Sequence, residues 1–274
     1  MSEEVYKKKE EIFEVIRKAG NEILKVYSGN DFQVEKKSDK TPLTLADKKS
    51  NDVIVNGLIR LFPELPLLSE ESKKTAYHER KGWEYLWLID PLDGTKEFIK
   101  KNGEFSINLA LIKDGKPIFG ILYLPVLGLF YYAGKGYGAY KIEKNGKKNN
   151  LKPAKYNKNG ANRSIRVIFS KSHYNQETRA YVDKIRNQYF QPTMISVGSA
   201  MKLAYLAEGK ADIYPRLAPT MEWDIAAGQI IVEETGGIVI DFLEKKPLKY
   251  NKKNLQNPWF LASGNSIDTL QLSQ

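Results

Sequence analysis

The chain has 274 residues, of which 42% are hydrophobic and 28% are charged, with a formal net charge of +10. This composition is typical of a soluble globular protein. It contains no cysteine, which excludes disulfides and thiolate metal sites, so any metal must be held by carboxylates or by the two histidines. The sequence contains no run of about 18 apolar residues, so no membrane-spanning helix is predicted. The charged N-terminus lacks the apolar core of a signal peptide. We expect a cytoplasmic protein, with a peripheral position at the inner face of the membrane left open.

The first half of the chain predicts helices followed by a largely antiparallel sheet. Apolar residues recur at helical spacing between residues 3 and 27, and Ser28 to Asn30 are typical of a helix end. A second helix is predicted from Asp47 to Leu61. Apolar or alternating runs separated by glycine turns then predict strands. These runs are 65–69, 84–89, 105–112, 117–125 and 128–142.

The second half predicts strands that alternate with helices, an α/β pattern. The polar stretch 144–163 is rich in glycine and asparagine and separates the two patterns. We therefore predict two subdomains, 1–150 and 151–274. The expected strands are 164–170, 193–198, 211–215 and 238–241, and the expected helices are 174–188, 199–209 and 224–237.

Four carboxylates stand where predicted elements begin or end. Glu70 follows the strand LPLLS, Asp90 follows YLWLI, Asp93 comes one turn later, and Asp224 begins a helix. Strand ends on one side of a sheet converge, so these side chains can share a pocket. Carboxylate oxygens suit Mg²⁺ or Mn²⁺. Each residue taken alone also fits an ordinary turn former or a helix N-cap.

These carboxylates lie in three ordered motifs, LLSEES, WLIDPLDGT and EWDIAAGQIIVEETGG, and the resemblance that the motifs carry covers nearly the whole chain. Together they resemble the metal-dependent, lithium-sensitive phosphatases of the inositol monophosphatase superfamily. Within it, DPLDGTKEFIKKNGEFSINLALI and KADIYPR are most similar to CysQ-type 3′(2′),5′-bisphosphate nucleotidases. The resemblance implies an α+β / α/β fold, a layered αβαβα sandwich of the sugar-phosphatase type. It also implies removal of the 3′-phosphate from adenosine 3′,5′-bisphosphate, giving AMP and phosphate, in sulfur assimilation or nucleotide recycling.

The resemblance also implies roles for individual residues around two or three Mg²⁺ ions, with Mn²⁺ as an alternative. Glu70, Asp90 and the Leu92 carbonyl match ligands of a first ion, and Asp90, Asp93 and Asp224 match those of a second. Thr95 and Glu70 match the pair that orients and deprotonates the attacking water. Asp47 matches an aspartate that helps to hold a third ion. Matches to substrate-binding positions are Gly94, Thr95, Ser170, His173, Gly198, Ser199, Lys202 and Arg216.

Arg216 bears on the choice of substrate. Inositol monophosphatases carry an acidic residue at the matching position, where it binds the inositol hydroxyls. An arginine suits a second phosphate, such as the 5′-phosphate, through a charge-assisted hydrogen bond. Pairing of Arg216 with a surface carboxylate is the simpler alternative. A phosphatase acting on inositol phosphate or another small sugar phosphate remains the runner-up function.

Two other classes of protein were weighed against a phosphatase. The charge of +10 and the sixteen tyrosines are compatible with nucleic-acid binding. Most aromatic residues, however, lie inside apolar runs, which is typical of a core and not of a base-stacking surface. A scaffold that lost catalysis is disfavoured because no ligand position is substituted. We therefore expect a small nucleotide as substrate, no nucleic-acid partner, and a monomer or a homodimer.

Overall fold

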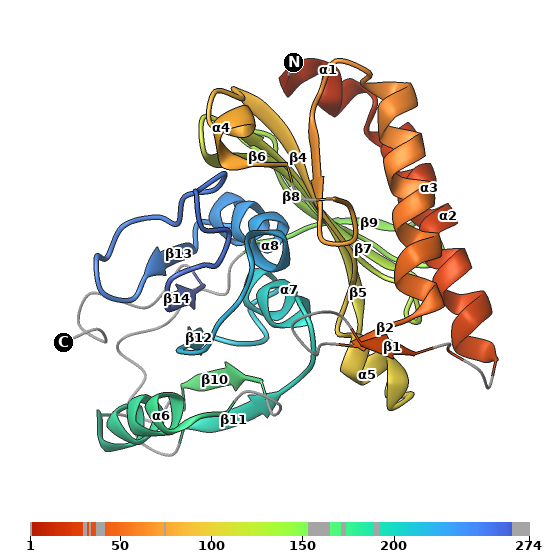
Figure 1. Cartoon of the computed structure of the whole chain (residues 1–274). Helices are drawn as coiled ribbons and strands as arrows, with labels where there is room; N and C mark the ends of the chain where they lie inside the picture. Colours follow the sequence, from red (N-terminus) through yellow and green to blue (C-terminus); the bar gives the residue numbers. More distant parts are fainter. Residues whose placement is uncertain are drawn as a thin grey trace.

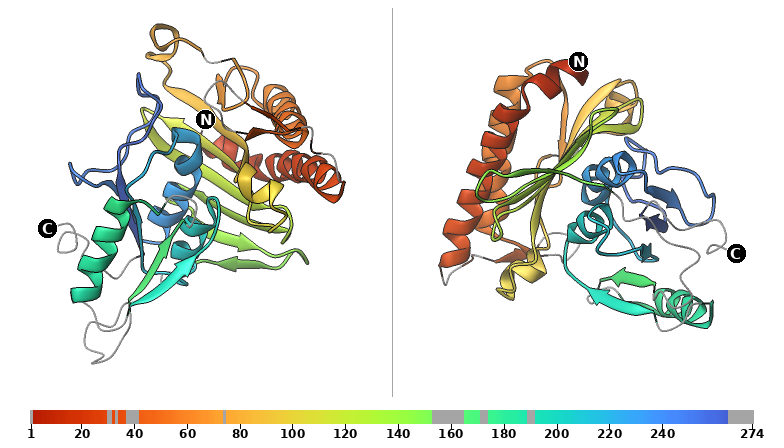
Figure 2. Two further views of the ribbon diagram at one scale, coloured as in Figure 1. Left: turned by 60° about the horizontal axis from the view of Figure 1, so that its bottom comes forward. Right: turned by 180° about the vertical axis from the view of Figure 1, so that it is seen from behind.

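The computed structural model describes residues 2–29, 32, 34–36, 42–73, 75–152, 165–170, 174–188 and 192–264. Helices and sheets alternate in five layers (Figures 1 and 2). Helices α2 (Lys9–Ser28) and α3 (Leu45–Leu61) cover one face of a seven-stranded sheet. Helices α7 (Met201–Ala207) and α8 (Glu222–Glu234) lie on its other face, followed by a five-stranded sheet and α6 (Gln176–Gln188). The expected αβαβα layering is confirmed.

The outer helices form because apolar residues recur on one side of each. In α2 that side buries Ile12, Ile16 and Ile23 against the sheet. The short α1 (Ser2–Lys7) precedes it. Helix α3 begins at a capping box, in which Thr44 and Asp47 satisfy backbone amides of the first turn. These elements match the two helices predicted from the sequence.

The seven-stranded sheet has the order β3-β4-β5-β6-β7-β8-β9. Its first pair, β3 and β4, is parallel, and the remaining pairs are antiparallel. The prediction of a largely antiparallel sheet is confirmed. The strands are β3 (Leu67–Ser69), β4 (Tyr85–Asp93), β5 (Ser106–Lys113), β6 (Lys116–Leu124), β7 (Leu129–Gly134), β8 (Gly138–Ile142) and β9 (Lys148–Asn150).

One detail of β4 differs from the prediction. The strand was expected to end at Asp90, but it continues to Asp93 with an irregular register between Asp90 and Asp93. A bulge of this kind adds a residue on one strand and turns side chains that would otherwise alternate between faces. Both aspartates can therefore serve the same site although they are three residues apart.

The five-stranded sheet has the order β11-β10-β12-β14-β13. Its first three strands run parallel, in keeping with the predicted α/β alternation, but β14 pairs antiparallel with both β12 and β13. The sequence did not predict β14. The strands are β10 (Arg166–Phe169), β11 (Thr193–Ser196), β12 (Ile213–Arg216), β13 (Ile238–Asp241) and β14 (Phe260–Ser263).

Four short elements complete the described fold. A two-stranded sheet pairs β1 (Glu35–Lys36) with β2 (Pro42–Leu43). Helix α4 (Tyr77–Arg80) follows β3, and α5 (Thr95–Ile99) begins directly after β4. Neither helix was predicted, because each is one turn long and carries no clear apolar period.

Helix α8 joins the two halves of the chain. It belongs to the second half of the chain and contains the motif EWDIAAGQ, yet it packs on β5 and β6 of the first sheet. One hydrophobic cluster accordingly contains Leu122 of the first sheet, Ile230 of α8 and Phe260 of the second sheet. The division into subdomains 1–150 and 151–274 stays a prediction, since this core is continuous across it.

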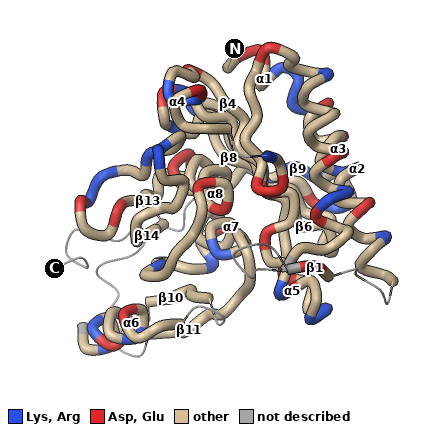
Figure 3. Tube along the Cα trace, viewed as in Figure 1, with Lys and Arg blue, Asp and Glu red and all other residues tan. Residues whose placement is uncertain are grey.

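Charged residues are distributed over many elements. In Figure 3 lysines and arginines are interspersed with acidic residues along the outer helices and in the loops. No helix in the described part of the chain has the length and apolar character needed to cross a membrane.

The crossing of α8 over β6 yields a first prediction. A Cβ atom at Gly120 of β6 would lie 2.7 Å from the Ala227 carbonyl oxygen and 2.9 Å from its Cα, both backbone atoms. Gly120→Ala should therefore force α8 outward and lower the free energy of unfolding by about 1–3 kcal/mol, measured by urea denaturation. Gly82→Ala is the matched control, because a Cβ there meets nothing within 4 Å. Equal stability of the two variants would contradict this close crossing.

Candidate active site

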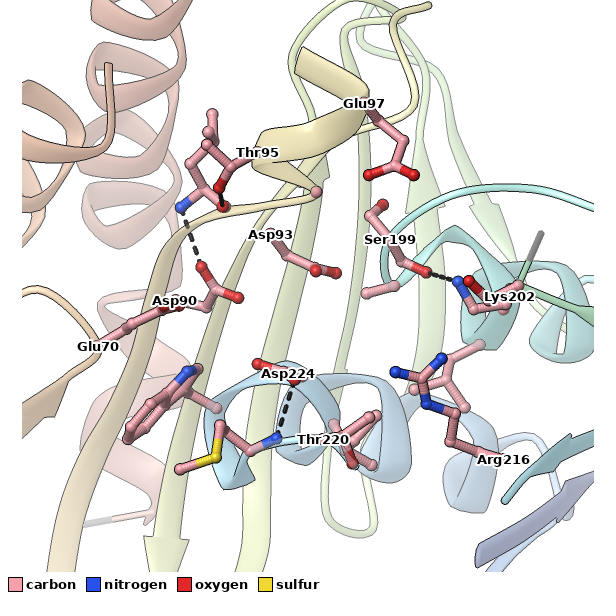
Figure 4. A pocket seen from close by; sticks show the side chains of 18 of the residues that line it. Glu70, Asp90, Asp93, Thr95, Glu97, Ser199, Lys202, Arg216, Thr220 and Asp224 are labelled. Atoms are coloured by element: carbon pink, nitrogen blue, oxygen red, sulfur yellow. Dashed lines mark hydrogen bonds between the residues drawn. The ribbon is translucent and has the colours of Figure 1, made fainter. Parts of the chain in front are cut away.

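A cavity of about 280 Å³ lies where the two halves of the chain meet (Figure 4). The loop after β3, the end of β4 and α5 line it from the first half of the chain, and α7, β12 and the start of α8 line it from the second half. Charged and polar side chains of the lining are Glu70, Asp90, Asp93, Thr95, Lys96, Glu97, Ser170, Ser199, Lys202, Tyr214, Arg216, Thr220 and Asp224.

Three carboxylates from three elements converge in this cavity. One oxygen each of Glu70, Asp90 and Asp224 lies within 4.8 Å of the others. Glu70 and Asp90 are neighbours because β3 and β4 are parallel, and the Glu70 amide donates to the Ile89 carbonyl at 3.1 Å. Asp224 is fixed at the start of α8, where its Oδ2 accepts the Met221 amide at 2.9 Å. The predicted convergence of these three residues is confirmed.

Burial and crowding make these carboxylates costly to ionise. Burial, followed by repulsion from Glu70, Asp93 and Asp224, raises the pKa of Asp90 well above its ordinary value. Burial, together with the charges of Asp93 and Glu70, likewise raises the pKa of Asp224. Burial also raises the pKa of Asp93 to about 6, against the opposing influence of Lys202. Ionised together, these groups repel one another in a poorly solvated space.

The donor set fits a hard divalent cation. Such ions bind carboxylate oxygens, and their positive charge removes the repulsion between the ligands. Asp93 lines the same cavity, and the Leu92 carbonyl is close enough to the Thr95 hydroxyl, at 3.4 Å, to accept a hydrogen bond. The sequence has no cysteine, and among the described residues the cluster offers carboxylate oxygens alone.

Thr95 is held at the edge of the cluster by Asp47. Its Oγ1 lies 3.3 Å from Asp47 Oδ1. The other Asp47 oxygen accepts both the amide and the hydroxyl of Thr44, at 2.8 and 2.5 Å. Asp47 is 1% exposed and is absent from the cavity lining, so it lies behind Thr95 and caps α3. Its expected part in holding a third ion stays a prediction.

The opposite wall of the cavity is basic. Burial lowers the pKa of Lys202 to about 8 although Asp93 favours its charged form, and its Nζ donates to the Ser199 carbonyl at 2.5 Å. Arg216 is 8% exposed and donates from Nη2 to the Pro219 carbonyl at 2.9 Å. Among the described residues its buried Nε has no partner. In Figure 4 both side chains face the acidic cluster.

Most of the predicted site residues in the described part of the chain line the cavity, and Asp47 and Gly198 do not. Gly94, Ser170 and Ser199 join the acidic and basic residues there. Gly198 lines an adjoining smaller cavity instead, and its amide donates to Glu104 Oε2 at 2.7 Å. His173 lies outside the described residues. The assignment of these residues to substrate binding stays a prediction.

Several lining residues were not found from the sequence. Lys96 and Glu97 follow the DGT motif directly, and Tyr214 and Thr220 flank Arg216. Burial raises the pKa of Tyr214 to about 12, so it stays a neutral hydroxyl. Proximity in sequence to predicted residues was the one available signal, because none of the four stands at a strand end that calls for a ligand.

The burial of Asp93, with repulsion from Glu70 as a smaller cause, predicts an effect of Asp93→Asn on the metal-free protein. The pKa of Asp93 is about 6 in the folded chain and 3.8 ordinarily, so its ionisation opposes folding above that window. In EDTA at pH 7.5 the free energy of unfolding of the variant should therefore be about 1–3 kcal/mol higher than that of the wild type, which is measured as a higher Tm. The gain should fall as the pH is lowered through 6 and vanish below about pH 3, where the wild-type group is protonated in both states.

The exposed Asp52 of α3 provides the control, since Asp52→Asn removes a carboxylate of the same type outside the cluster. A lower Tm for Asp93→Asn than for wild type in EDTA at pH 7.5 would show that this carboxylate is not under repulsion.

The sequence matches a known protein family along almost its whole length. The model of the inositol monophosphatase family matches residues 3–267. A protein of Salmonella typhimurium named 3′(2′),5′-bisphosphate nucleotidase CysQ is 41% identical over 254 residues, 92% of this chain and 97% of that protein. The protein of the same name from Escherichia coli K12 is 40% identical over 257 residues, 93% and 98% of the two chains.

Solved structures agree with the sequence relatives. The crystal structure of CysQ from Bacteroides thetaiotaomicron has a TM-score of 0.81 and 38% identity, covering 94% of this chain and 97% of that one. A Thermotoga maritima IMPase has a TM-score of 0.75 and 27% identity, covering 95% and 92%. With a family match along almost its entire length and relatives at about 40% identity, the chain belongs to the inositol monophosphatase family.

Proposed function

We propose that the protein is a Mg²⁺-dependent 3′(2′),5′-bisphosphate nucleotidase that hydrolyses the 3′-phosphate of adenosine 3′,5′-bisphosphate to AMP and phosphate. The observation that carries this proposal is a single cavity in which a carboxylate cluster faces two buried basic side chains. The relatives named as nucleotidases support the same activity, since they match 92–93% of this chain at about 40% identity.

The acidic wall is the proposed site of phosphate hydrolysis. Glu70, Asp90 and Asp224 would hold a divalent cation, with Asp93 and the Leu92 carbonyl as further ligands. When bound, such ions neutralise phosphoryl oxygens and lower the pKa of coordinated water. Phosphoryl transfer depends mainly on positioning and charge stabilisation, and carboxylates fixed on β4 and α8 meet that requirement.

Thr95 is suited to orient the attacking water. Its hydroxyl donates to one oxygen of Asp47, and the other oxygen of Asp47 accepts the hydroxyl of Thr44. Since Asp47 is fixed by the first turn of α3, the Thr95 rotamer is held from behind. Glu70, at the other side of the cluster, is the carboxylate that would take the proton, as its place in the motif LLSEES implies.

The basic wall is the proposed site of the second phosphate. Arg216 has a buried Nε without a partner among the described residues, and buried donors of this kind are costly unless a ligand satisfies them. Lys202 adjoins it, and the positive charge of Arg216 disfavours that of Lys202. An anionic group between them would relieve this repulsion and satisfy the free donor. A bisphosphate can engage both walls at once, whereas a monophosphate engages one.

A substitution at Arg216 tests the choice of substrate. Arg216→Gln removes one charge-assisted contact, which should lower kcat/KM for adenosine 3′,5′-bisphosphate by about 10- to 100-fold. Turnover of inositol 1-phosphate should change far less. Phosphate release from the two substrates with Mg²⁺ gives both values. Arg186→Gln is the control, because that arginine is exposed and pairs with Asp183 on α6.

Two outcomes would overturn parts of this proposal. Wild-type preference for inositol 1-phosphate would favour the sugar-phosphatase alternative, in which Glu97 at the cavity wall accepts substrate hydroxyls. An equal loss on both substrates in Arg216→Gln would assign Arg216 to the architecture of the cavity and remove it from phosphate recognition.

Removal of divalent ions tests the acidic wall. Dialysis against EDTA should abolish phosphate release, and added Mg²⁺ should restore it. Added Mg²⁺ should also raise Tm at pH 7.5, because binding to the folded state stabilises it and ends the repulsion between Asp90 and Asp224. Asp90→Asn should abolish both responses. Full activity in EDTA would contradict metal dependence.

A further inference from the structure

A loop outside the cavity lining joins the first turn of α8, which carries Asp224, to α4, which follows Glu70 in the chain. Residues 249–257, here called the strap, form part of the connection between β13 and β14. In Figure 1 this blue segment extends from the second sheet toward α4. Loops usually run over the protein surface, but several side chains of the strap are buried. Tyr250 and Asn257 are each 3% exposed, and Leu255 is 8% exposed.

One side of the strap holds the first turn of α8, which carries Asp224. The Glu222 amide donates to the Leu255 carbonyl at 2.9 Å. The Glu222 carboxylate, which is fully buried, accepts the amides of Asn251 and Lys252 at 2.6 and 3.0 Å and the Lys252 ammonium at 2.6 Å. Asn257 adds bonds to the Thr220 hydroxyl and the Met221 carbonyl.

The other side of the strap holds α4, the element that follows Glu70 in the chain. Arg80 and Asn251 make a reciprocal pair: Arg80 Nη1 donates to Asn251 Oδ1, and Asn251 Nδ2 donates to the Arg80 carbonyl, both at 2.7 Å. Arg80 also reaches the Lys253 and Thr75 carbonyls, each at 3.3 Å. Its side chain is buried, with 2% of the residue exposed.

Asn251 is therefore the joint between the two sides. Its backbone donates to Glu222 and its side chain pairs with Arg80, which are separated from it by 29 and 171 residues. Its φ of +60° is in the left-handed region, which asparagine tolerates better than most residues. The conformation turns its amide and its side chain toward different partners.

We propose that the Arg80–Asn251–Glu222 network is a positioning device for the metal site, which sets the separation of the Glu70 and Asp224 carboxylates. The inference rests on the proposed function in one respect, the binding of a divalent cation. Metal ligands need to be held close to their productive geometry by residues behind them. Here the two ligands come from opposite halves of the chain, and the network links those halves behind the cluster.

The charges in the network favour positioning over stability. Arg80 and Glu222 are both buried, and desolvation of such groups offsets most of what their contacts contribute. Apolar side chains of similar volume would stabilise the loop as well or better. Directional hydrogen bonds, by contrast, fix one arrangement of α4 and α8, because each carboxylate or guanidinium contact has a narrow range of angle.

Asn251→Gly is the sharpest test of the network. Glycine keeps the left-handed backbone and the amide bond to Glu222, and it removes only the pair with Arg80. The measurement is the Kd of Mn²⁺ for the full chain, from electron paramagnetic resonance of the free ion, which requires no turnover. We expect Kd to rise about tenfold or more. The activating concentration of Mg²⁺ should rise in parallel, whereas kcat at saturating Mg²⁺ should change much less.

Arg166→Lys is the matched control. Arg166 pairs with the buried Asp212 at 2.6 Å and lies at the start of β10, the strand end opposite the cavity. It should lower Tm and leave the Mn²⁺ Kd unchanged. Arg80→Lys should weaken Mn²⁺ binding as Asn251→Gly does, and the double variant should be no weaker than the single ones, because both remove the same link.

The outcomes separate the two proposals. An unchanged Mn²⁺ Kd in both Asn251→Gly and Arg80→Lys, with Tm lowered as in Arg166→Lys, would overturn the positioning role and leave the metal site intact. Failure of the wild-type chain to bind Mn²⁺ at all would instead overturn the proposed metal-dependent function. Weaker binding in both network variants and not in the control would support the inference.

Discussion

The repulsion among buried carboxylates is the constraint on which the site depends. Asp90, Asp93 and Asp224 have raised pKa values because burial and neighbouring charges disfavour their ionised forms. An unconstrained chain would move them apart. The fold keeps them together because Asp90 and Asp93 belong to an interior strand and Asp224 caps a buried helix. The chain thus holds an unfavourable charge arrangement that a divalent cation makes favourable.

The same constraint explains why the two halves interlock. The ligands come from the first sheet and from α8, so the site exists only where α8 lies against β5 and β6. Gly120 permits that close approach. The buried bonds of Arg80 and Asn251 join the elements around the cavity from outside it. Rigid elements, rather than the loops alone, therefore determine the geometry of the carboxylates.

The cavity has acidic side chains on one side and basic side chains on the other, which favours one orientation of a bound anion. Burial alone would favour a neutral Lys202, but the Asp93 carboxylate favours its ammonium form. Arg216 lies on the same wall with one donor unused among the described residues. An anion with two separated phosphates complements such a cavity, since one end meets the basic wall and the other meets the cation side.

The sequence by itself determined most of the helices and strands and the carboxylates that stand at their ends. Apolar patterns predicted α2, α3 and the strands β3 to β8 of the first sheet, and the carboxylates at Glu70, Asp90 and Asp224 stood out at element ends. These features depend on neighbours within a few positions. Only the tertiary structure decided that β4 continues past Asp90, that β14 joins the second sheet, and that Asn251 meets Arg80 across 171 residues. Such contacts depend on which elements pack together. A pattern within a few residues does not indicate which distant residue a side chain will contact.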